Sequence, residues 1–150
     1  MKPLRGRTSR SFRQKISSRI AEADSLCLQL RTLLHENHLQ CVCFAVELLA
    51  RECLNNAVLH GNQNNADKSV WFHLRVGRKW IRLQVKDQGA GFAWRKARQR
   101  ELDTSAPSGR GLRLCMLYAW RVRFNRQGNQ ITLWISKHKP TKKEGRNGCV

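Results

Sequence analysis

The sequence predicts an α+β fold, a two-layer sandwich in which helices cover one face of a mixed, mostly antiparallel sheet. Two observations lead to this expectation. Apolar residues recur at helical spacing in the first part of the chain, and after about residue 69 they alternate with polar residues, which is typical of strands. The predicted order is helix, helix, two strands, a glycine loop, helix and two strands. A chain of 150 residues fits one such domain.

Three helices are predicted. The first begins at about residue 11 and ends within 35–38, on the basis of apolar residues at steps of three or four: Ile16, Ile20, Ala23, Cys27, Leu30 and Leu34. The second covers 40–60, and its first half, CVCFAVELLA, is apolar on nearly all sides, as in a helix that is buried by several neighbours. Gly61 ends it. The third covers 112–119.

Four strands follow from alternating patterns at 70–76, 81–85, 121–126 and 130–136. The first two are joined by a turn at 77–79 and the last two by a turn at 127–129, so each pair is expected to be antiparallel. The five tryptophans are Trp71, Trp80, Trp94, Trp120 and Trp134. Several of them occur in strand or helix patterns, for which we expect packing in the core.

The chain has a formal net charge of +19, and the basic excess lies outside residues 22–66. We expect a flexible basic arm at 1–10, a single domain at 11–136 and a basic, disordered tail at 137–150. A partner with negative charge would suit the basic flanks, and a solvated basic surface is the alternative.

Neither a membrane span nor a secretory signal is expected. There is no run of 18 apolar residues, and residues 1–20 have a basic start without an apolar segment. The six cysteines form no CxxC pair and have no zinc-finger spacing with histidine. Five lie in apolar stretches, where a free cysteine packs as a small hydrophobic residue, and we expect a reducing cytoplasm.

Polar residues at the end of the second helix are the first candidate site. Glu52, Asn56 and His60 are spaced by four residues, which places them along one stripe. A carboxylate and an amide one turn apart can hold Mg²⁺ through oxygen atoms, and the carboxylate can accept a proton from an attacking hydroxyl. An exposed helical face with an ordinary side-chain hydrogen bond is the alternative.

Two glycine-containing segments are the second candidate. DQGAGF (87–92) follows a strand, and its glycines allow close approach of a ligand while Asp87 can accept a hydrogen bond. SGRGL (108–112) begins a helix, where backbone N–H groups attract phosphate. Neither segment has the pattern of a dinucleotide fingerprint or of a phosphate loop.

In this order, the three motifs resemble the GHKL or Bergerat-fold ATP-binding proteins, which include gyrase, histidine kinases and MutL. ARECLNNAVLHGN (50–62) is similar to the N box, DQGAGF to the first glycine box and SGRGL to the second. The small size and the HGN ending are most similar to the anti-sigma-factor serine kinases of bacterial partner switching. The resemblance covers roughly residues 11–136.

The resemblance implies ATP and Mg²⁺ as cofactors and a role for each matching residue. Glu52 would be the general base, Asn56 the Mg²⁺ ligand and Asp87 the acceptor for the adenine amino group. The other implied nucleotide contacts are Gly89, Gly91, Phe92, Gly109, Arg110, Gly111 and Leu112. Residues 93–108 would form a lid. The family often has threonine where Asn129 stands, and an asparagine amide can still donate a hydrogen bond.

The expected function is therefore that of an ATP- and Mg²⁺-dependent protein serine kinase. It would bind a sigma factor, an antagonist protein with the target serine, or both, and a homodimer is compatible with this role. Two alternatives are an ATP-gated binding module without kinase activity and, with less support, a basic protein that binds nucleic acid through its flanks and tryptophans.

Overall fold

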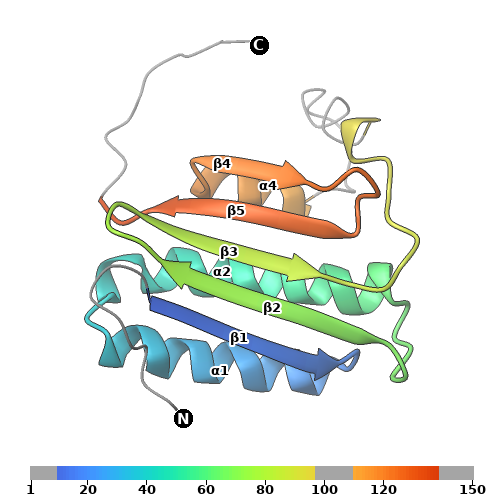
Figure 1. Cartoon of the computed structure of the whole chain (residues 1–150), viewed down its shortest axis with the longest axis horizontal. Helices are drawn as coiled ribbons and strands as arrows, with labels where there is room; N and C mark the ends of the chain where they lie inside the picture. The colour runs from blue at the N-terminus through green and yellow to red at the C-terminus, as the bar shows by residue number, and fades with distance from the viewer. Residues whose placement is uncertain (1–9, 97–109, 139–150) are drawn as a thin grey trace.

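A computed structural model describes residues 10–96 and 110–138 of the chain. Its centre is a five-stranded sheet with the order β1-β2-β3-β5-β4 (Figure 1). The four pairs of neighbouring strands are all antiparallel, so the described sheet contains no parallel pair. The strands are β1 (Arg10–Ser17), β2 (Ser69–Val76), β3 (Trp80–Lys86), β4 (Arg121–Phe124) and β5 (Gln130–Ser136).

The helices lie together on one face of this sheet, behind it in the view of Figure 1. The helices are α1 (Ile20–Glu36), α2 (Gln40–Asn56), the π-helical turn η1 (Ala57–Gly61) and α4 (Arg110–Tyr118). The predicted α+β sandwich with helices on one face is therefore confirmed. Between the two layers, Phe72, Leu74 and Leu83 of the sheet and Leu30 and Val46 of the helices are almost completely buried.

The prediction of a helix from residue 11 is wrong, because this segment forms the edge strand β1. Along the strand, Ile16 is buried and Phe12 half-buried, whereas Arg13 and Lys15 are exposed, which is the period of two of a strand. Ile16 is paired with Val70 of β2. The step of four from Ile16 to Ile20 crosses the junction of a strand and a helix, so it resembles a helical repeat by coincidence.

The prediction that several tryptophans pack in the core is also wrong. None of the five is buried: Trp120 is 62% exposed, Trp71 is 38% exposed and the other three are half-buried. In β2 the buried positions are Val70, Phe72, Leu74 and Val76, so Trp71 lies on the opposite face. The helix-free face of the sheet is accordingly rich in tryptophan.

The proposed arm at 1–10, except for Arg10, and most of the proposed tail at 137–150 lie outside the described residues. Arg10 is the first residue of β1. Within the described ranges, no helix has both the length and the apolar composition that crossing a bilayer requires.

Candidate nucleotide-binding site

The first candidate site forms where the end of α2 meets the beginning of α4. Glu52 and Asn56 are one turn apart on α2, and Gly111 lies in the first turn of α4. A Cβ atom on Gly111 would be 3.0 Å from Glu52 Oε2 and 3.0 Å from Asn56 Nδ2. The fold thus brings together two motifs that are separated by more than fifty residues, and a glycine leaves the space between them open.

The end of α2 widens into the π-helical turn η1. Its characteristic bond joins the Asn62 N–H to the Ala57 carbonyl at 2.8 Å. Because the wider turn changes the residue spacing, the exposed His60 does not simply continue the stripe of Glu52 and Asn56. The turn instead directs the backbone of Gly61 toward Asp87, and a Cβ on Gly61 would be 2.6 Å from both carboxylate oxygens.

Asp87 follows the last residue of β3, and hydrogen bonds from its own loop and from Asn129 hold it in place. Its Oδ1 atom accepts a hydrogen bond of 2.7 Å from the Gly89 N–H. Its backbone N–H donates to the Asn129 carbonyl at 3.0 Å, and its carbonyl accepts from Asn129 Nδ2 at 3.2 Å. Since a carboxylate has several acceptor positions, Asp87 keeps capacity for a further donor such as a purine amino group.

Burial raises the pKa of the Asp87 carboxyl, and this effect outweighs the hydrogen bond from Gly89 and the charge of Lys68, which lower it. An acid with a raised pKa in the folded state destabilises the fold when it ionises. Protonated Asp87 therefore contributes to the free energy of unfolding at low pH, and this contribution is lost as the pH rises from the ordinary pKa of aspartate through the raised pKa of the folded state. The chain therefore maintains a carboxylate at this position at an energetic cost, as is common in functional sites.

Asn62 is a site residue that the sequence analysis missed as an individual contributor. It is completely buried, and its Oδ1 accepts from the Gln88 N–H at 2.8 Å while its Nδ2 donates to the Ser69 carbonyl at 2.9 Å. Asn62 thus connects the end of η1 to the Asp87 loop and to the start of β2. The sequence gives little indication of this role. Asn62 follows Gly61 in a polar run, and such a run predicts an exposed turn and not a buried side chain.

Replacing Asn62 with alanine should lower the free energy of unfolding by about 2 kcal/mol, because a buried side chain is truncated and two part-buried backbone groups lose their partners. Urea denaturation of the wild type and of Asn62→Ala measures this difference. Ser25→Ala, on α1, is a control for which we expect less than about 0.5 kcal/mol. An Asn62→Ala protein as stable as this control would contradict the role of Asn62 in connecting the end of η1 to the Asp87 loop and to β2.

The side-chain amide of Asn129 already donates a hydrogen bond within the protein, so it does not point to a phosphate contact. Asn129 is buried, its amide is bonded to Asp87, and its Oδ1 accepts from Asn125 Nδ2 at 2.7 Å. Asn129 therefore positions the Asp87 loop. Gly91 has a φ of 81°, and a Cβ there would be 2.7 Å from the Gln127 carbonyl carbon, so the second glycine of DQGAGF allows the two loops to touch.

The remaining predicted contacts are only partly described. Arg110 is exposed at the beginning of α4, and Gly109 and most of the proposed lid, 97–108, lie outside the described residues. Phe92 is 47% exposed and its ring is edge-on to Phe124, with 5.2 Å between ring centroids. Among the described residues there is no cluster of three or more His, Cys, Asp or Glu side chains that could hold a metal ion.

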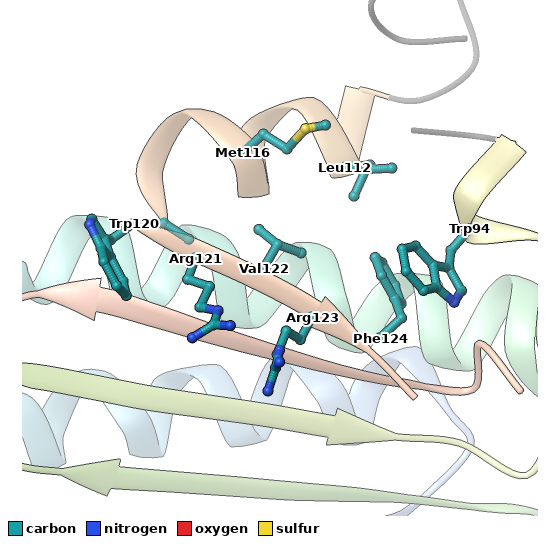
Figure 2. A pocket seen from close by; sticks show the side chains of 9 residues that line it. Trp94, Leu112, Met116, Trp120, Arg121, Val122, Arg123 and Phe124 are labelled. Carbon is teal, nitrogen blue, oxygen red and sulfur yellow. The ribbon is translucent and has the colours of Figure 1, made fainter. Parts of the chain in front are cut away.

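A pocket of about 700 Å³ adjoins this site between α4 and β4 (Figure 2). Trp94 stacks on Phe124 at one end, and Leu112 and Met116 of α4 face Val122 across it. Glu52, Asn56 and Asp87 are absent from its lining. Its lining contains no carboxylate or side-chain amide that would orient a purine, and its charged members are Arg121 and Arg123.

Comparisons with known proteins agree with this geometry. Residues 16–135 match the family of histidine kinase-like ATPase domains, so the chain belongs to that family. The chain is also 29% identical over 99 residues to the serine/threonine-protein kinase BtrW of Bordetella bronchiseptica. The aligned region covers 63% of this chain and 70% of that protein. The predicted resemblance to GHKL-type ATPases is therefore confirmed.

Proposed function

We propose that the chain is an ATP- and Mg²⁺-dependent protein serine kinase that also binds a regulatory partner, either a sigma factor or an antagonist protein with the target serine. The observation that carries the proposal is the contact of Gly111 with Glu52 and Asn56, together with the contact of Gly61 with Asp87. Membership of the ATPase family and similarity to a protein named as a serine/threonine kinase support it.

The residues present fit ATP with Mg²⁺. Asn56 offers an amide oxygen, a hard ligand that suits Mg²⁺ when phosphate oxygens complete the coordination. Bound Mg²⁺ would neutralise charge on the phosphates. The first backbone N–H groups of a helix have no intrahelical acceptor, so those at the start of α4, which begins at Arg110 in the described part of the chain, would donate to phosphate oxygens. Asp87 would accept the adenine amino hydrogen.

In the proposed reaction, the seryl oxygen of the partner attacks the terminal phosphorus of ATP, the bond to ADP breaks, and the Glu52 carboxylate orients the hydroxyl and accepts its proton. Glu52 is half-buried on α2 and lies beside Gly111 of α4. Catalysis would depend on positioning and on charge stabilisation, so no covalent enzyme intermediate is needed.

Nucleotide binding is tested first with Asp87→Asn. Calorimetric titration of the wild type should show saturable ATP binding that depends on Mg²⁺, and the variant should bind at least about tenfold more weakly, since it loses a hydrogen bond to a charged acceptor. At pH 7 the variant should unfold at a higher temperature than the wild type, because it lacks a partly buried charge but keeps an Oδ1 acceptor for Gly89. Loss of both ATP binding and stability would indicate a structural role for Asp87 instead.

Kinase activity is tested by incubating the protein with γ-labelled ATP, Mg²⁺ and a recombinant antagonist protein from a partner-switching system. Label on a serine of the antagonist supports the proposal. ATP binding without label, in a protein whose affinity for the antagonist changes with ATP, would overturn it in favour of an ATP-gated binding module.

A further inference from the structure

The helix-free face of the sheet, here called the open face, carries a concentration of positive charge and tryptophan that the proposed kinase reaction does not use. The described cations on this face are Arg13, Lys15, Arg75, Arg82, Lys86, Arg121 and Arg123. No acidic side chain of the described strands lies on it. The described acidic residues are on α1 and α2 and in the loops at residues 67 and 87, so the helix layer has charges of both signs whereas the described side chains of the open face have only positive charge.

Strand register arranges these side chains in rows across the open face. Three of the rows are Lys15–Trp71–Lys86–Gln130, Arg13–His73–Gln84–Thr132–Arg123 and Ser11–Arg75–Arg82–Trp134–Arg121. Trp80 lies beyond the third row, and its ring packs against Trp120 with 4.7 Å between centroids. Every row therefore places cations next to aromatic or polar groups.

Contacts between the side chains confirm that the cations and the tryptophans are neighbours. Lys15 Nζ lies 5.6 Å from the centre of the Trp71 ring, and the Arg121 guanidinium lies 5.7 Å from the centre of the Trp134 ring. In Figure 2, Arg121 and Arg123 extend from β4 on the side opposite to Val122. The open face thus has both charged groups for phosphates and aromatic groups for bases.

The electrostatic environment at the centre of this face is positive. Burial and the charges of Arg13, Arg82 and Arg75 lower the pKa of His73, against a hydrogen bond with Gln84 that raises it. Ser11 and Arg13 of β1 also lie within 3.3 Å of His73 Nε2. The Nε atom of Arg82 is shielded from solvent and has no hydrogen-bond partner in the described part of the chain. Arg75 and Arg82 are in register on neighbouring strands, which places two cations side by side on this face.

We propose that the open face binds single-stranded nucleic acid, a function separate from the proposed kinase reaction. Non-specific binding of single strands combines a basic surface that follows the phosphates with aromatic rings on which bases stack. Both components are present here on one face of the sheet. A second copy of the chain would bring the same positive charge to the face and is disfavoured by repulsion.

The test is fluorescence anisotropy of a labelled oligothymidylate of about 15 nucleotides, with the full chain, over a series of salt concentrations. The double variant Arg13→Gln/Arg123→Gln removes two exposed cations from the two edge strands. We expect it to weaken binding at low salt by at least about tenfold, and to reduce the slope of log K against log salt by about 1.4, or 0.7 for each phosphate contact. Arg31→Gln, which removes a cation from the helix layer, is the matched control and should bind like the wild type.

A second variant tests the stacking. Trp134→Leu should weaken binding by about 5- to 150-fold, with an unchanged salt slope, because a stacking ring is lost but no charge. If this variant fails to fold, Trp71→Leu removes a more exposed ring from the same face. An equal affinity of the wild type and of both face variants would overturn the proposal, because the binding would then use cations elsewhere in the chain.

Two competing polyanions identify the class of partner. Unlabelled polyglutamate and phosphatidylglycerol vesicles should displace the oligonucleotide only at much higher concentrations of negative charge. Displacement by either at an equal concentration of charge, without loss of affinity in Trp134→Leu, would overturn the proposal in favour of an acidic protein or a membrane surface.

Discussion

Glu52→Gln should reduce the rate of phosphate transfer by about 10²- to 10⁴-fold, which is the usual contribution of a general base. Glutamine keeps the length and shape of the side chain but cannot accept the seryl proton. ATP affinity should stay within about threefold of the wild type, because the assigned nucleotide contacts at Asp87 and Asn56 are intact. Single-turnover transfer from labelled ATP, measured beside calorimetric ATP binding, separates the two effects.

Glu47→Gln is the matched control for this experiment. Glu47 is on the same helix and has an ion pair with Arg31 of α1, with 2.5 Å between Arg31 Nη2 and Glu47 Oε1. Exposed ion pairs contribute little to stability, so this variant should transfer phosphate at the wild-type rate. Transfer at the wild-type rate by Glu52→Gln would remove the general base from the mechanism and leave Glu52 as a structural neighbour of Gly111.

Local patterns were sufficient to predict much of this molecule. The alternation in β2 and β3, the apolar first half of α2 and the glycines before α4 are all local features, and the structure contains each of these four elements at or near its expected bounds. The motifs with Glu52, Asp87 and Gly111 could be predicted as one site because their order along the chain resembles a known family. Their direct contacts required the fold.

The wrong predictions for residues 11–19 and for the tryptophans, and the missed role of Asn62, have one physical cause: each depends on contacts between segments that are distant in the sequence. β1 lies at the edge of the sheet and is followed closely by α1, so its period of two is visible only once Ile16 is paired with Val70. The tryptophans were expected in the core because a strand pattern alone does not show which face a helix covers. The role of Asn62 depends on Gln88 and Ser69, which approach it only in the folded chain.

The side chains of the open face bear on the alternative functions that the sequence left open, and on nucleic-acid binding in particular. Nucleic-acid binding has little support if the tryptophans lie in the core, and it gains support because Trp71 lies beside Lys15 of β1 and Trp134 beside Arg121 of β4. The proposed kinase site and the open face use opposite sides of the sheet. A chain with both could respond to two ligands independently, and the Arg13→Gln/Arg123→Gln protein is expected to keep its ATP affinity.

Gly89→Ala should lower ATP affinity by at least about 100-fold and the free energy of unfolding by about 1–3 kcal/mol, the usual cost of overpacking. A Cβ atom on Gly89 would overlap the Gly61 carbonyl, whose carbon would be 2.6 Å away, and would be 2.8 Å from Asp87 Oδ1. Backbone on one side and a fixed carboxylate on the other leave no flexible side chain to move aside. The Asp87 loop must therefore separate from the end of η1.

Gly77→Ala provides the comparison that makes this prediction specific. Gly77 lies in the turn between β2 and β3, at the opposite end of the sheet from Asp87, and a Cβ there would meet only the Trp80 carbonyl, at 3.2 Å. This variant should bind ATP like the wild type, with a change in stability below about 1 kcal/mol. Calorimetry and urea denaturation of both variants measure the difference. Wild-type ATP affinity in Gly89→Ala would show that the nucleotide does not depend on the contact between Gly61 and the Asp87 loop, and the adenine site would have to be placed elsewhere.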